Sequence, residues 1–234
     1  MTNRPTSAQP ELTILMPCLN EEENIAYAIR SAMKFLSENK IHGEVLIADN
    51  QSSDSSVKIA QQEGARVISE PVPGYGSTLR AGINAAKGTY IIMGDCDSTY
   101  DFANLTSFWE ALCSGADFVI GNRFAGGIEK GAMPFSHRFI GVPVLSVLGR
   151  IRFKTKVKDF HCGLRGFRSD IARSLPFQTT GMEFATEMIA LFASSGATIK
   201  EVPTALKVSQ NPRRPHLKAV RDGLRHLKYI LFLK

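Results

Sequence analysis

The sequence predicts an α/β fold in which a mostly parallel, twisted sheet is covered by helices on both faces. Through the first 122 residues, short aliphatic and β-branched runs alternate with amphipathic stretches of helical spacing. The chain has 234 residues, of which 44% are hydrophobic, and this is enough for one well-buried core. Parallel strands need crossover helices between them, so this alternation indicates a sheet that is buried on both sides.

Each element follows from its local pattern. Strands are expected at the aliphatic runs LTILM, EVLIA, ARVIS and TYIIM and at a fifth short run, at positions 12–16, 44–48, 65–69, 89–93 and 117–121. Helices are expected where apolar residues recur every three to four positions, at 21–37, 53–63, 77–86 and 102–114. Asn20 is expected to cap the first helix and Ser52 or Ser53 the second, because their side-chain oxygens can accept first-turn N–H groups.

Polar segments follow three of these strands, at 17–22, 49–54 and 95–97. In parallel sheets, ligands bind beyond the carboxyl ends of the strands. Capping does not account for Asp95 and Asp97, which follow a buried run and flank Cys96. Two carboxylates so placed are costly unless a cation lies between them. We therefore expect Mg²⁺ or Mn²⁺ here, since these ions take oxygen ligands and complete their coordination with substrate phosphates.

Charge is unevenly distributed along the chain, although the net charge is only +6. Residues 1–122 carry 8 basic and 15 acidic groups, residues 123–173 carry 11 and 3, and the last thirty residues carry 8 and 1. This distribution favours a metal in the first half and phosphate or anionic lipid in the second. A solvated charged surface is the alternative interpretation.

Composition excludes several classes of protein. No apolar run reaches the roughly 18–20 residues of a membrane span, and the first eleven residues lack the apolar stretch of a signal peptide. The four cysteines lie far apart without a CxxC pair, so neither a zinc site nor a disulfide framework is predicted. We expect reduced thiols and a cytoplasmic protein.

Several motifs, in order along nearly the whole chain, resemble one enzyme family. They are MP at 16–17, LNEEENI at 19–25, SSD at 52–54, GYGS at 74–77 with LRAG at 79–82, GDCD at 94–97, GNRF at 121–124, DFHCGLRGF at 159–167, MEF at 182–184 with EMI at 187–189, and EVP at 201–203. Together they resemble the inverting family 2 glycosyltransferases, in particular the polyprenyl-phosphate hexose synthases of the dolichyl-phosphate mannose or glucose synthase type.

The resemblance implies a GT-A-type nucleotide-sugar-binding domain over residues 1–210, followed by a basic loop and amphipathic helix over 211–234. It also implies a set of donor contacts. The nucleotide would be held by Pro17, Asn20, Glu21, Glu22, Asp49, Gly76, Arg80 and Asp95. Asp95 and Asp97 would form the metal and diphosphate site, which makes Asp97 a catalytic candidate.

The acceptor is expected on the basic second half. Catalytic roles are assigned to Arg123, which follows a strand, and to Arg165, which is expected in a glycine-flanked turn. The acceptor phosphate or lipid would be bound by Arg123, Arg138, Arg165, Arg213 and Arg214. A polyprenyl phosphate is already an anionic nucleophile and needs orientation more than deprotonation.

Glu183 is the candidate base for the alternative of a hydroxyl acceptor, which does need one. In a structural alternative, Glu183 caps a helix and Glu187, one turn on, pairs with a basic neighbour. His161 is open between a phosphate contact and a packed structural histidine, and the structural role is favoured.

Two segments predict contact with a membrane surface. The segment 137–150 is apolar between basic ends, and its Gly141 and Pro143 would break a long core helix. Near the end of the chain, apolar residues at 217, 220, 224, 227 and 231 alternate with lysine and arginine, as in a basic amphipathic helix. Core packing of the first segment and a coiled coil for the second are the alternatives.

The predicted function is metal-dependent transfer of a hexose from a nucleotide sugar to a polyprenyl or dolichyl phosphate, by a peripheral protein on the inner face of the cell membrane. UDP-glucose is the expected donor, because the segments 180–189 and 211–216 resemble glucose synthase-like sequences. Transfer to a hydroxyl and sugar binding without turnover are the alternatives. A nucleotidyltransferase is disfavoured because residues 17–20 contain no glycine. Nucleic acid is disfavoured because no basic run is interleaved with aromatic residues.

Overall fold

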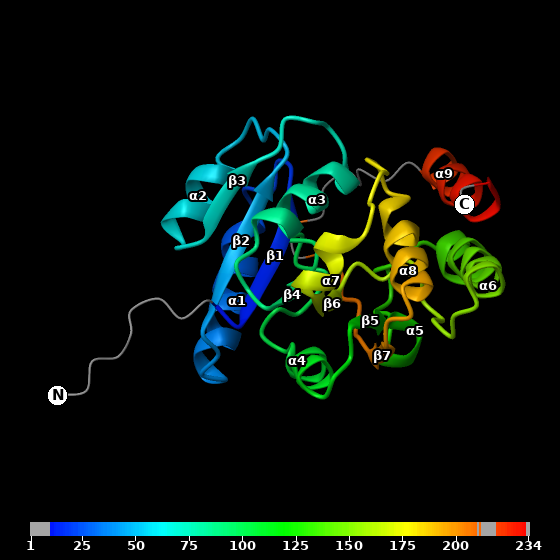
Figure 1. The fold of residues 1–234 in the computed structure, drawn as a ribbon. Helices are drawn as coiled ribbons and strands as arrows, with labels where there is room; N and C mark the ends of the chain where they lie inside the picture. The colour runs from blue at the N-terminus through cyan, green and yellow to red at the C-terminus, as the bar shows by residue number, and fades with distance from the viewer. Residues whose placement is uncertain (1–9, 210, 212–218, 233–234) are drawn as a thin grey trace.

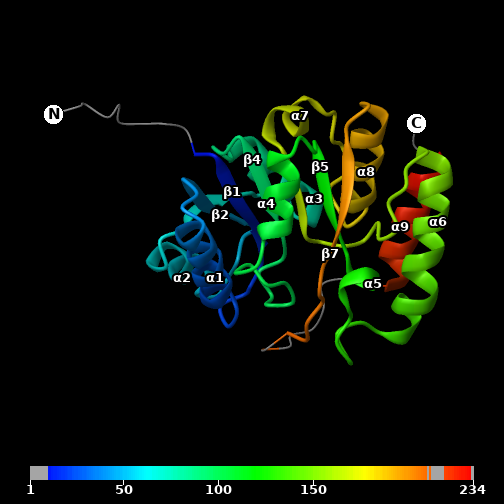
Figure 2. The same ribbon diagram turned by 90° about the horizontal axis from the view of Figure 1, so that it is seen from below.

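The computed structural model describes residues 10–209, 211 and 219–232, and in them one seven-stranded sheet runs in the order β3-β2-β1-β4-β6-β5-β7. Helices lie against both of its faces (Figure 1, Figure 2). The strands are β1 (Leu12–Cys18), β2 (Gly43–Asp49), β3 (Arg66–Ser69), β4 (Tyr90–Met93), β5 (Phe118–Asn122), β6 (Arg165–Arg168) and β7 (Ile199–Pro203). The helices are α1 (Ile25–Glu38), α2 (Ser56–Gln62), α3 (Tyr75–Ala85), α4 (Thr106–Cys113), α5 (Arg123–Gly126), the π-helical turn η1 (His137–Gly141), α6 (Val142–Phe153), α7 (Ser169–Ser174), α8 (Phe184–Ser194) and α9 (Ala219–Phe232).

The predicted α/β fold is confirmed, with every predicted strand and helix of the first half in place. The capping prediction is wrong. The N-cap residues are Asn24 for α1 and Ser55 for α2, and neither makes a capping side-chain hydrogen bond. Asn20 instead has a left-handed backbone, with φ of 55°, and its side chain reaches across to Ser53. The loop between β1 and α1 is therefore longer than the pattern indicated.

Strand β6 was not predicted, and it changes which segments meet. It pairs antiparallel with both neighbours, with Arg165 opposite Met93 on one side and Ile120 on the other. The expected turn at Arg165 is thus wrong, because Arg165 begins β6 and the flanking Gly166 is paired with Ile92 and Val119. Since β6 runs against the other strands, its beginning lies at their carboxyl ends. The segment 159–164 therefore joins the edge where the segments after β4 and β5 lie.

An aromatic cluster fixes α8 on the sheet. Phe192 of α8 lies 4.6 Å from the ring of Phe118 on β5 and 5.9 Å from Phe167 on β6, between ring centroids. All three side chains are fully buried, and burying each contributes about 1.5–3 kcal/mol to stability. This packing holds the carboxyl end of α8 against β5 and β6.

At the opposite end of the sheet from α2 and β3, α9 packs against both α6 and α8 (Figure 1, Figure 2). The π-helical turn η1 runs directly into α6, so Gly141 and Pro143 do not interrupt the helix. Pro143 lies in the first turn of α6, where a missing N–H breaks no helical bond. Within the described residues, no helix has the length and hydropathy needed to cross a bilayer.

Candidate active site

Reciprocal hydrogen bonds lock the loop after β1 to the loop after β2, and we call residues 17–24 and 49–56 the interlocked loops. Asn20 Oδ1 accepts the Ser53 N–H at 2.8 Å, while Ser52 Oγ accepts the Asn20 N–H at 2.9 Å. Glu22 Oε2 accepts the Ser55 N–H at 3.0 Å. A pocket of about 310 Å³ opens beside them, lined by Asn20, Glu21, Glu22, Glu23, Asn24 and Asp54.

The other predicted nucleoside contacts lie in or next to these loops. Glu21 and Asp49 are buried, and both carboxylate oxygens of Asp49 accept the N–H of Ser52, at 3.3 and 3.2 Å. The carbonyl of half-buried Pro17 accepts the Cys96 thiol at 3.3 Å. The structure thus brings the candidates from β1 and β2 together and joins them to the segment after β4.

Gly76 and Arg80 lie elsewhere, on α3 against the segment 177–180. The Gly76 N–H donates to Thr180 O at 2.9 Å, and a Cβ on Gly76 would come within 2.5 Å of Thr179 O. Arg80 Nη1 donates to Phe177 O at 3.3 Å. The glycine is therefore required for close packing of α3, and the nucleotide contacts predicted for both residues stay predictions.

Asp95 lies against the segment 159–164, whereas the side chain of Asp97 bonds within its own loop. Asp97 Oδ1 accepts the N–H and the hydroxyl of Thr99, at 3.1 and 2.6 Å. Asp95 accepts a hydrogen bond from Tyr75, and a Cβ on Gly163 would lie 2.7 Å from Asp95 Oδ2. Burial raises the pKa of Asp95 to about 7, and the charge of Asp97 adds to this effect.

These two carboxylates fit a divalent cation. Among the residues that the structure describes, no lysine or arginine forms an ion pair with either of them. The same residues contain no cluster of three or more histidine, cysteine or acidic ligands. Mg²⁺ typically takes one or two carboxylates and completes its octahedron with water and substrate phosphates, so a pair of aspartates beside a diphosphate is a sufficient donor set.

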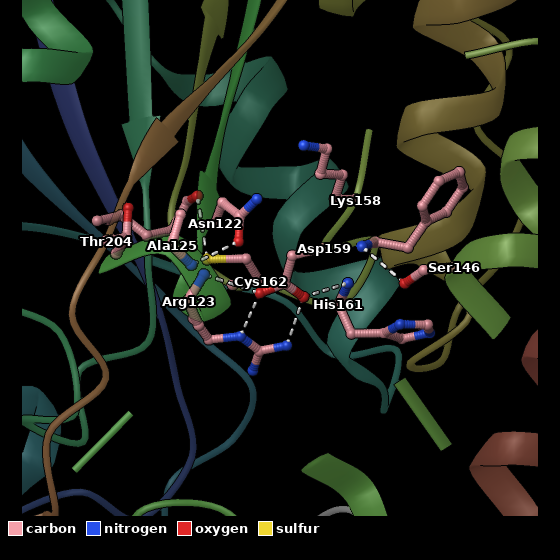
Figure 3. A network of polar contacts seen from close by, with 12 residues as sticks. Asn122, Arg123, Ala125, Ser146, Lys158, Asp159, His161, Cys162 and Thr204 are labelled. Carbon is pink, nitrogen blue, oxygen red and sulfur yellow. Dashed lines mark hydrogen bonds and ion pairs between the residues drawn. The ribbon is translucent and has the colours of Figure 1, made fainter. Parts of the chain in front are cut away.

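Arg123 is held by a buried ion pair (Figure 3). Its Nε and Nη2 each donate to an Asp159 carboxylate oxygen at 2.7 Å, and its backbone N–H donates to the same group at 3.0 Å. The side chain of Asp159 is completely buried and that of Arg123 nearly so. Arg123 Nη1 has no hydrogen-bond partner among the described residues. Sequence reasoning quoted Asp159 only as part of a motif and missed this role.

Arg165 is held in the interior by backbone groups, and its predicted catalytic and acceptor contacts stay predictions. Its side chain is fully buried. Nε donates to Cys162 O at 2.9 Å, Nη2 to Phe160 O at 2.9 Å and Nη1 to Ala185 O at 2.6 Å. The guanidinium therefore joins the segment 160–162 to α8.

The structure does not match the alternative in which Glu183 caps a helix and Glu187 pairs with a basic neighbour. Glu183 precedes α8 without a capping side-chain bond, and its Oε1 accepts Arg225 Nη2 of α9 at 2.7 Å. Its Oε2 is buried without a partner. Glu187 accepts the N–H groups of Gln178 and Thr179, at 2.9 and 3.1 Å, rather than pairing with a base. It is Glu183 that has the basic partner, and no sequence pattern linked it to Arg225.

His161 is a packed histidine, as favoured from the sequence. Its ring lies edge-on to the ring of His226 on α9, with 4.5 Å between centroids, and both of its ring nitrogens are buried without a partner. His226 Nδ1 shares a hydrogen bond of 2.8 Å with Thr186 Oγ1. Burial lowers the pKa of His226 to about 4 and that of His161 well below its ordinary value, so both rings are neutral near pH 7.

The second half of the chain exposes a set of large apolar side chains with basic neighbours, and we call this set the outer face. They are Phe135, Phe139, Ile140, Val144, Val147 and Ile151 around η1 and α6, and Val220, Leu224, Leu231 and Phe232 on α9. Arg138 lies over the ring of Phe139, 5.4 Å from its centroid. The remaining predicted acceptor residues, Arg213 and Arg214, lie outside the described residues, as does the apolar residue Leu217.

Comparison with known proteins identifies the family. The model of "Glycosyl transferase family 2" matches residues 13–175. The chain belongs to glycosyl transferase family 2. It is therefore a glycosyltransferase, and the order and direction of its strands form a GT-A-like α/β fold.

Two relatives and one solved structure illustrate the likeness. A low-salt glycan biosynthesis hexosyltransferase, Agl6 of Haloferax volcanii, is 37% identical over 95% of this chain, which spans 53% of that relative's length. A dolichyl-phosphate hexose transferase of the same organism is 29% identical over 82% of the chain and 81% of its own length. The crystal structure of glucosyl-3-phosphoglycerate synthase from Mycobacterium tuberculosis, with Mn²⁺, UDP and phosphoglyceric acid, superposes with a TM-score of 0.74 at 22% identity, covering 96% of this chain and 80% of the synthase.

Proposed function

We propose that this family 2 glycosyltransferase moves a hexose, with inversion, from a nucleotide sugar to a polyprenyl or dolichyl phosphate at the cytoplasmic face of the membrane. An acceptor phosphate oxygen attacks the anomeric carbon of the sugar, and the bond from that carbon to the nucleoside diphosphate breaks. Both electrons of the broken bond leave with the diphosphate. No proton has to be removed from the ionised acceptor.

The donor would occupy the edge formed by the interlocked loops and the segment after β4. Asn20, Glu22 and buried Asp49 lie around or next to the pocket after β1 and β2, where a nucleoside can meet polar side chains and backbone. Asp95 and Asp97 are placed to hold Mg²⁺ or Mn²⁺ at the diphosphate. When bound, the ion supplies positive charge that offsets the charge developing on the leaving diphosphate.

The acceptor phosphate would bind on the other side of Asp95, at Arg123. The ion pair with Asp159 fixes the guanidinium in one orientation and leaves Nη1 for a phosphate oxygen. Glu183 is bound by Arg225, which disfavours it as a general base and so favours an acceptor that needs none. Arg138, in η1, would contact the phosphate or the lipid headgroups.

The observation that carries the lipid acceptor is the orientation of α9. Its polar residues Asp222 and His226 are buried against the rest of the chain, while Val220 and Leu224 are exposed by 78% and 60%. Tyr229 and Ile230 of α9 are buried as well, so only part of the apolar surface of this helix is covered, and its exposed apolar side chains are free for a bilayer interface. The exposed apolar side chains of η1 and α6 extend the same surface, and flanking lysines and arginines suit anionic headgroups.

UDP-glucose is the proposed donor. The structural neighbour crystallised with UDP, and a relative named as a dolichyl-phosphate hexose transferase supports the acceptor class. Both are properties of those proteins, so the donor is tested directly. Thermal unfolding with UDP-glucose, GDP-mannose and dTDP-glucose, each with and without Mn²⁺, should show a metal-dependent stabilisation with UDP-glucose alone. Equal shifts with all three sugars would contradict this choice.

The decisive experiment is transfer of labelled glucose to polyprenyl phosphate in phosphatidylglycerol vesicles. Wild-type protein with Mn²⁺ should form the lipid product, and Asp97→Ala should lower the rate by about a thousandfold or more, because the charge on the leaving diphosphate is then uncompensated. Asp101→Ala, which removes a carboxylate paired with Lys207, is the matched control and should retain activity. Full activity of Asp97→Ala would refute the metal site.

Transfer to a hydroxyl is the second candidate, because Glu183 Oε2 is buried without a hydrogen-bond partner although Oε1 of the same carboxylate is bound by Arg225. A base is essential for a hydroxyl acceptor, so Glu183→Gln would then abolish transfer with little change in donor binding. With a phosphate acceptor, the same variant loses only the charge that holds Arg225. A moderate loss on polyprenyl phosphate therefore supports the first candidate, and complete loss supports the second.

A further inference from the structure

Two consecutive residues of α9 touch two different segments, each of which is linked to Asp95 by further contacts. Arg225 contacts the segment 178–183, which ends at the start of α8, and His226 contacts the segment 159–163, which precedes β6. These segments are separate in the chain and approach Asp95 by different elements, the first through α3 and the second through Gly163. No other contact described above joins α9 to the surroundings of the metal carboxylates.

The contact through Arg225 leads to Asp95 by way of α3. Arg225 Nη2 binds Glu183 Oε1 at 2.7 Å, and its guanidinium lies so close to Gly181 that a Cβ there would come within 2.4 Å of Cζ. The adjacent Thr180 O accepts the N–H of Gly76 at 2.9 Å and so holds the first turn of α3. Tyr75, in that first turn, hydrogen-bonds Asp95.

The contact through His226 leads to Asp95 by a shorter route. The ring of His226 supports the ring of His161, whose own nitrogens have no partner and whose position therefore depends on packing. Two residues further on, the Gly163 N–H donates to the Tyr100 hydroxyl at 2.9 Å, and Gly163 lies against Asp95 Oδ2. Two residues earlier, Asp159 holds Arg123.

We propose that Arg225 and His226 are positioning residues that brace the two walls of the active site, so that Asp95 and Arg123 are aligned only when α9 is docked. This inference rests on the proposed function for its catalytic consequence, but the bracing itself is a property of the fold. Because the opposite side of α9 belongs to the outer face, docking of the chain on a membrane and alignment of the site share one helix.

The bracing is tested with four substitutions in the full chain. Arg225→Ala removes the contact with Glu183, and Arg225→Lys keeps the charge. Gly181→Ala displaces the guanidinium without removing it, and this glycine does not have a left-handed backbone, so alanine is compatible with its conformation. His226→Ala removes the support of His161. Arg30→Ala is the matched control, because it also breaks an arginine–glutamate pair, with Glu63 on the far side of the molecule.

Hydrogen–deuterium exchange is the first measurement, and it does not depend on activity. Arg225→Ala and Gly181→Ala should speed amide exchange in residues 178–181 by about tenfold, and His226→Ala should do the same in residues 161–163, since exchange reports local opening. Arg225→Lys should restore most of the protection, and Arg30→Ala should leave both segments unchanged. Unchanged exchange in both segments in the Arg225 and His226 variants would overturn the bracing.

Steady-state kinetics is the second measurement. Because bracing acts on alignment of the reacting groups, kcat should fall by about tenfold or more in Arg225→Ala and His226→Ala while the KM for the donor changes by less than about twofold. A variant that merely unfolds in part would lose kcat in proportion to its folded fraction, which thermal unfolding measures. Looser segments with unchanged kcat would overturn the catalytic part of the proposal. If wild-type protein transfers no sugar, the exchange result still decides the bracing, and only the proposed function fails.

Discussion

The two sides of the active site are stabilised in different ways. On the first side, the interlocked loops share many short hydrogen bonds between side chains and backbone, and carboxylates such as Glu22 and Asp54 accept N–H groups near the surface. On the second side, single buried groups hold whole segments, as Asp159 holds Arg123 and His226 supports His161. We call this second set, with Glu183 and Arg225, the buried network.

The difference predicts how each side tolerates change. Removing one partner of an exposed, redundant hydrogen bond leaves its neighbours in place and lets water substitute. Removing one partner of a buried ion pair leaves an uncompensated charge in a region of low dielectric. The first side should therefore respond to substitution in small increments and the second in large ones. Three measurements test this contrast.

The largest effect is expected from Asp159→Ala. It leaves the Arg123 guanidinium buried without its bidentate partner, which should destabilise the fold by about 3–5 kcal/mol. Urea denaturation followed by circular dichroism measures the loss. Asp170→Ala is the control, since it breaks an exposed pair with Arg168 and should cost less than about 1 kcal/mol. Equal losses in the two variants would remove the contrast.

The second-largest effect is expected from acid, which should destabilise the buried network through His226. His226 is neutral in the fold, with a pKa of about 4 against 6.5 when unfolded, so unfolding takes up a proton between these values. The part of the folding free energy that depends on neutral His226 is fully present above about pH 6.5. It is lost as the pH falls toward 4, and the total loss of stability is about 3 kcal/mol. The groups that face its ring are Glu183, Arg165, Asp222, Arg225, Thr186 and His161.

Urea midpoints at pH 7 and pH 5 measure this dependence. His226→Phe keeps an aromatic ring without a titrating nitrogen, so it should lose clearly less stability between these two pH values than the wild-type protein. Other carboxylates respond to pH in both proteins, and their contribution cancels in the difference. Identical slopes in the two proteins would show that His226 does not titrate on unfolding.

The smallest effect is expected in the interlocked loops. Glu22→Gln keeps an oxygen that can accept the Ser55 N–H, so the loss should be about 0.5–1 kcal/mol. Ser53→Ala removes a single exposed hydroxyl and should change stability even less. The same denaturation measurement reports both. A loss above about 3 kcal/mol in either variant would place these loops with the buried network.

The sequence predicted the first half of the molecule well because its strands are parallel. Residues that follow β1, β2, β4 and β5 were identified by the rule that ligands bind at carboxyl ends, and these residues do lie along one edge. The rule fails for β6, which runs antiparallel and brings the residues before it to that edge. Asp159 and Gly163 therefore had no assigned role, and Arg165 was expected in a turn although it begins a strand.

Contacts between segments that are distant in the sequence could also not be predicted from the sequence pattern. The basic and apolar positions of α9 were predicted correctly as an amphipathic helix, but nothing in its spacing showed that Arg225 would meet Glu183 or that His226 would meet His161. Tertiary packing decides such pairs, whereas periodicity reports only which residues share a face. The amphipathic pattern did not show which face of α9 packs against the rest of the chain.

The place of α9 in the chain has a consequence for synthesis. The ribosome delivers the interlocked loops and both metal-site aspartates early, and α9 among the last residues of the sequence given. A nascent chain that has emerged through β7 can already assemble the sheet, but its active-site walls lack their brace until α9 has docked. Alignment of the site would thus be completed only after α9 has emerged and docked.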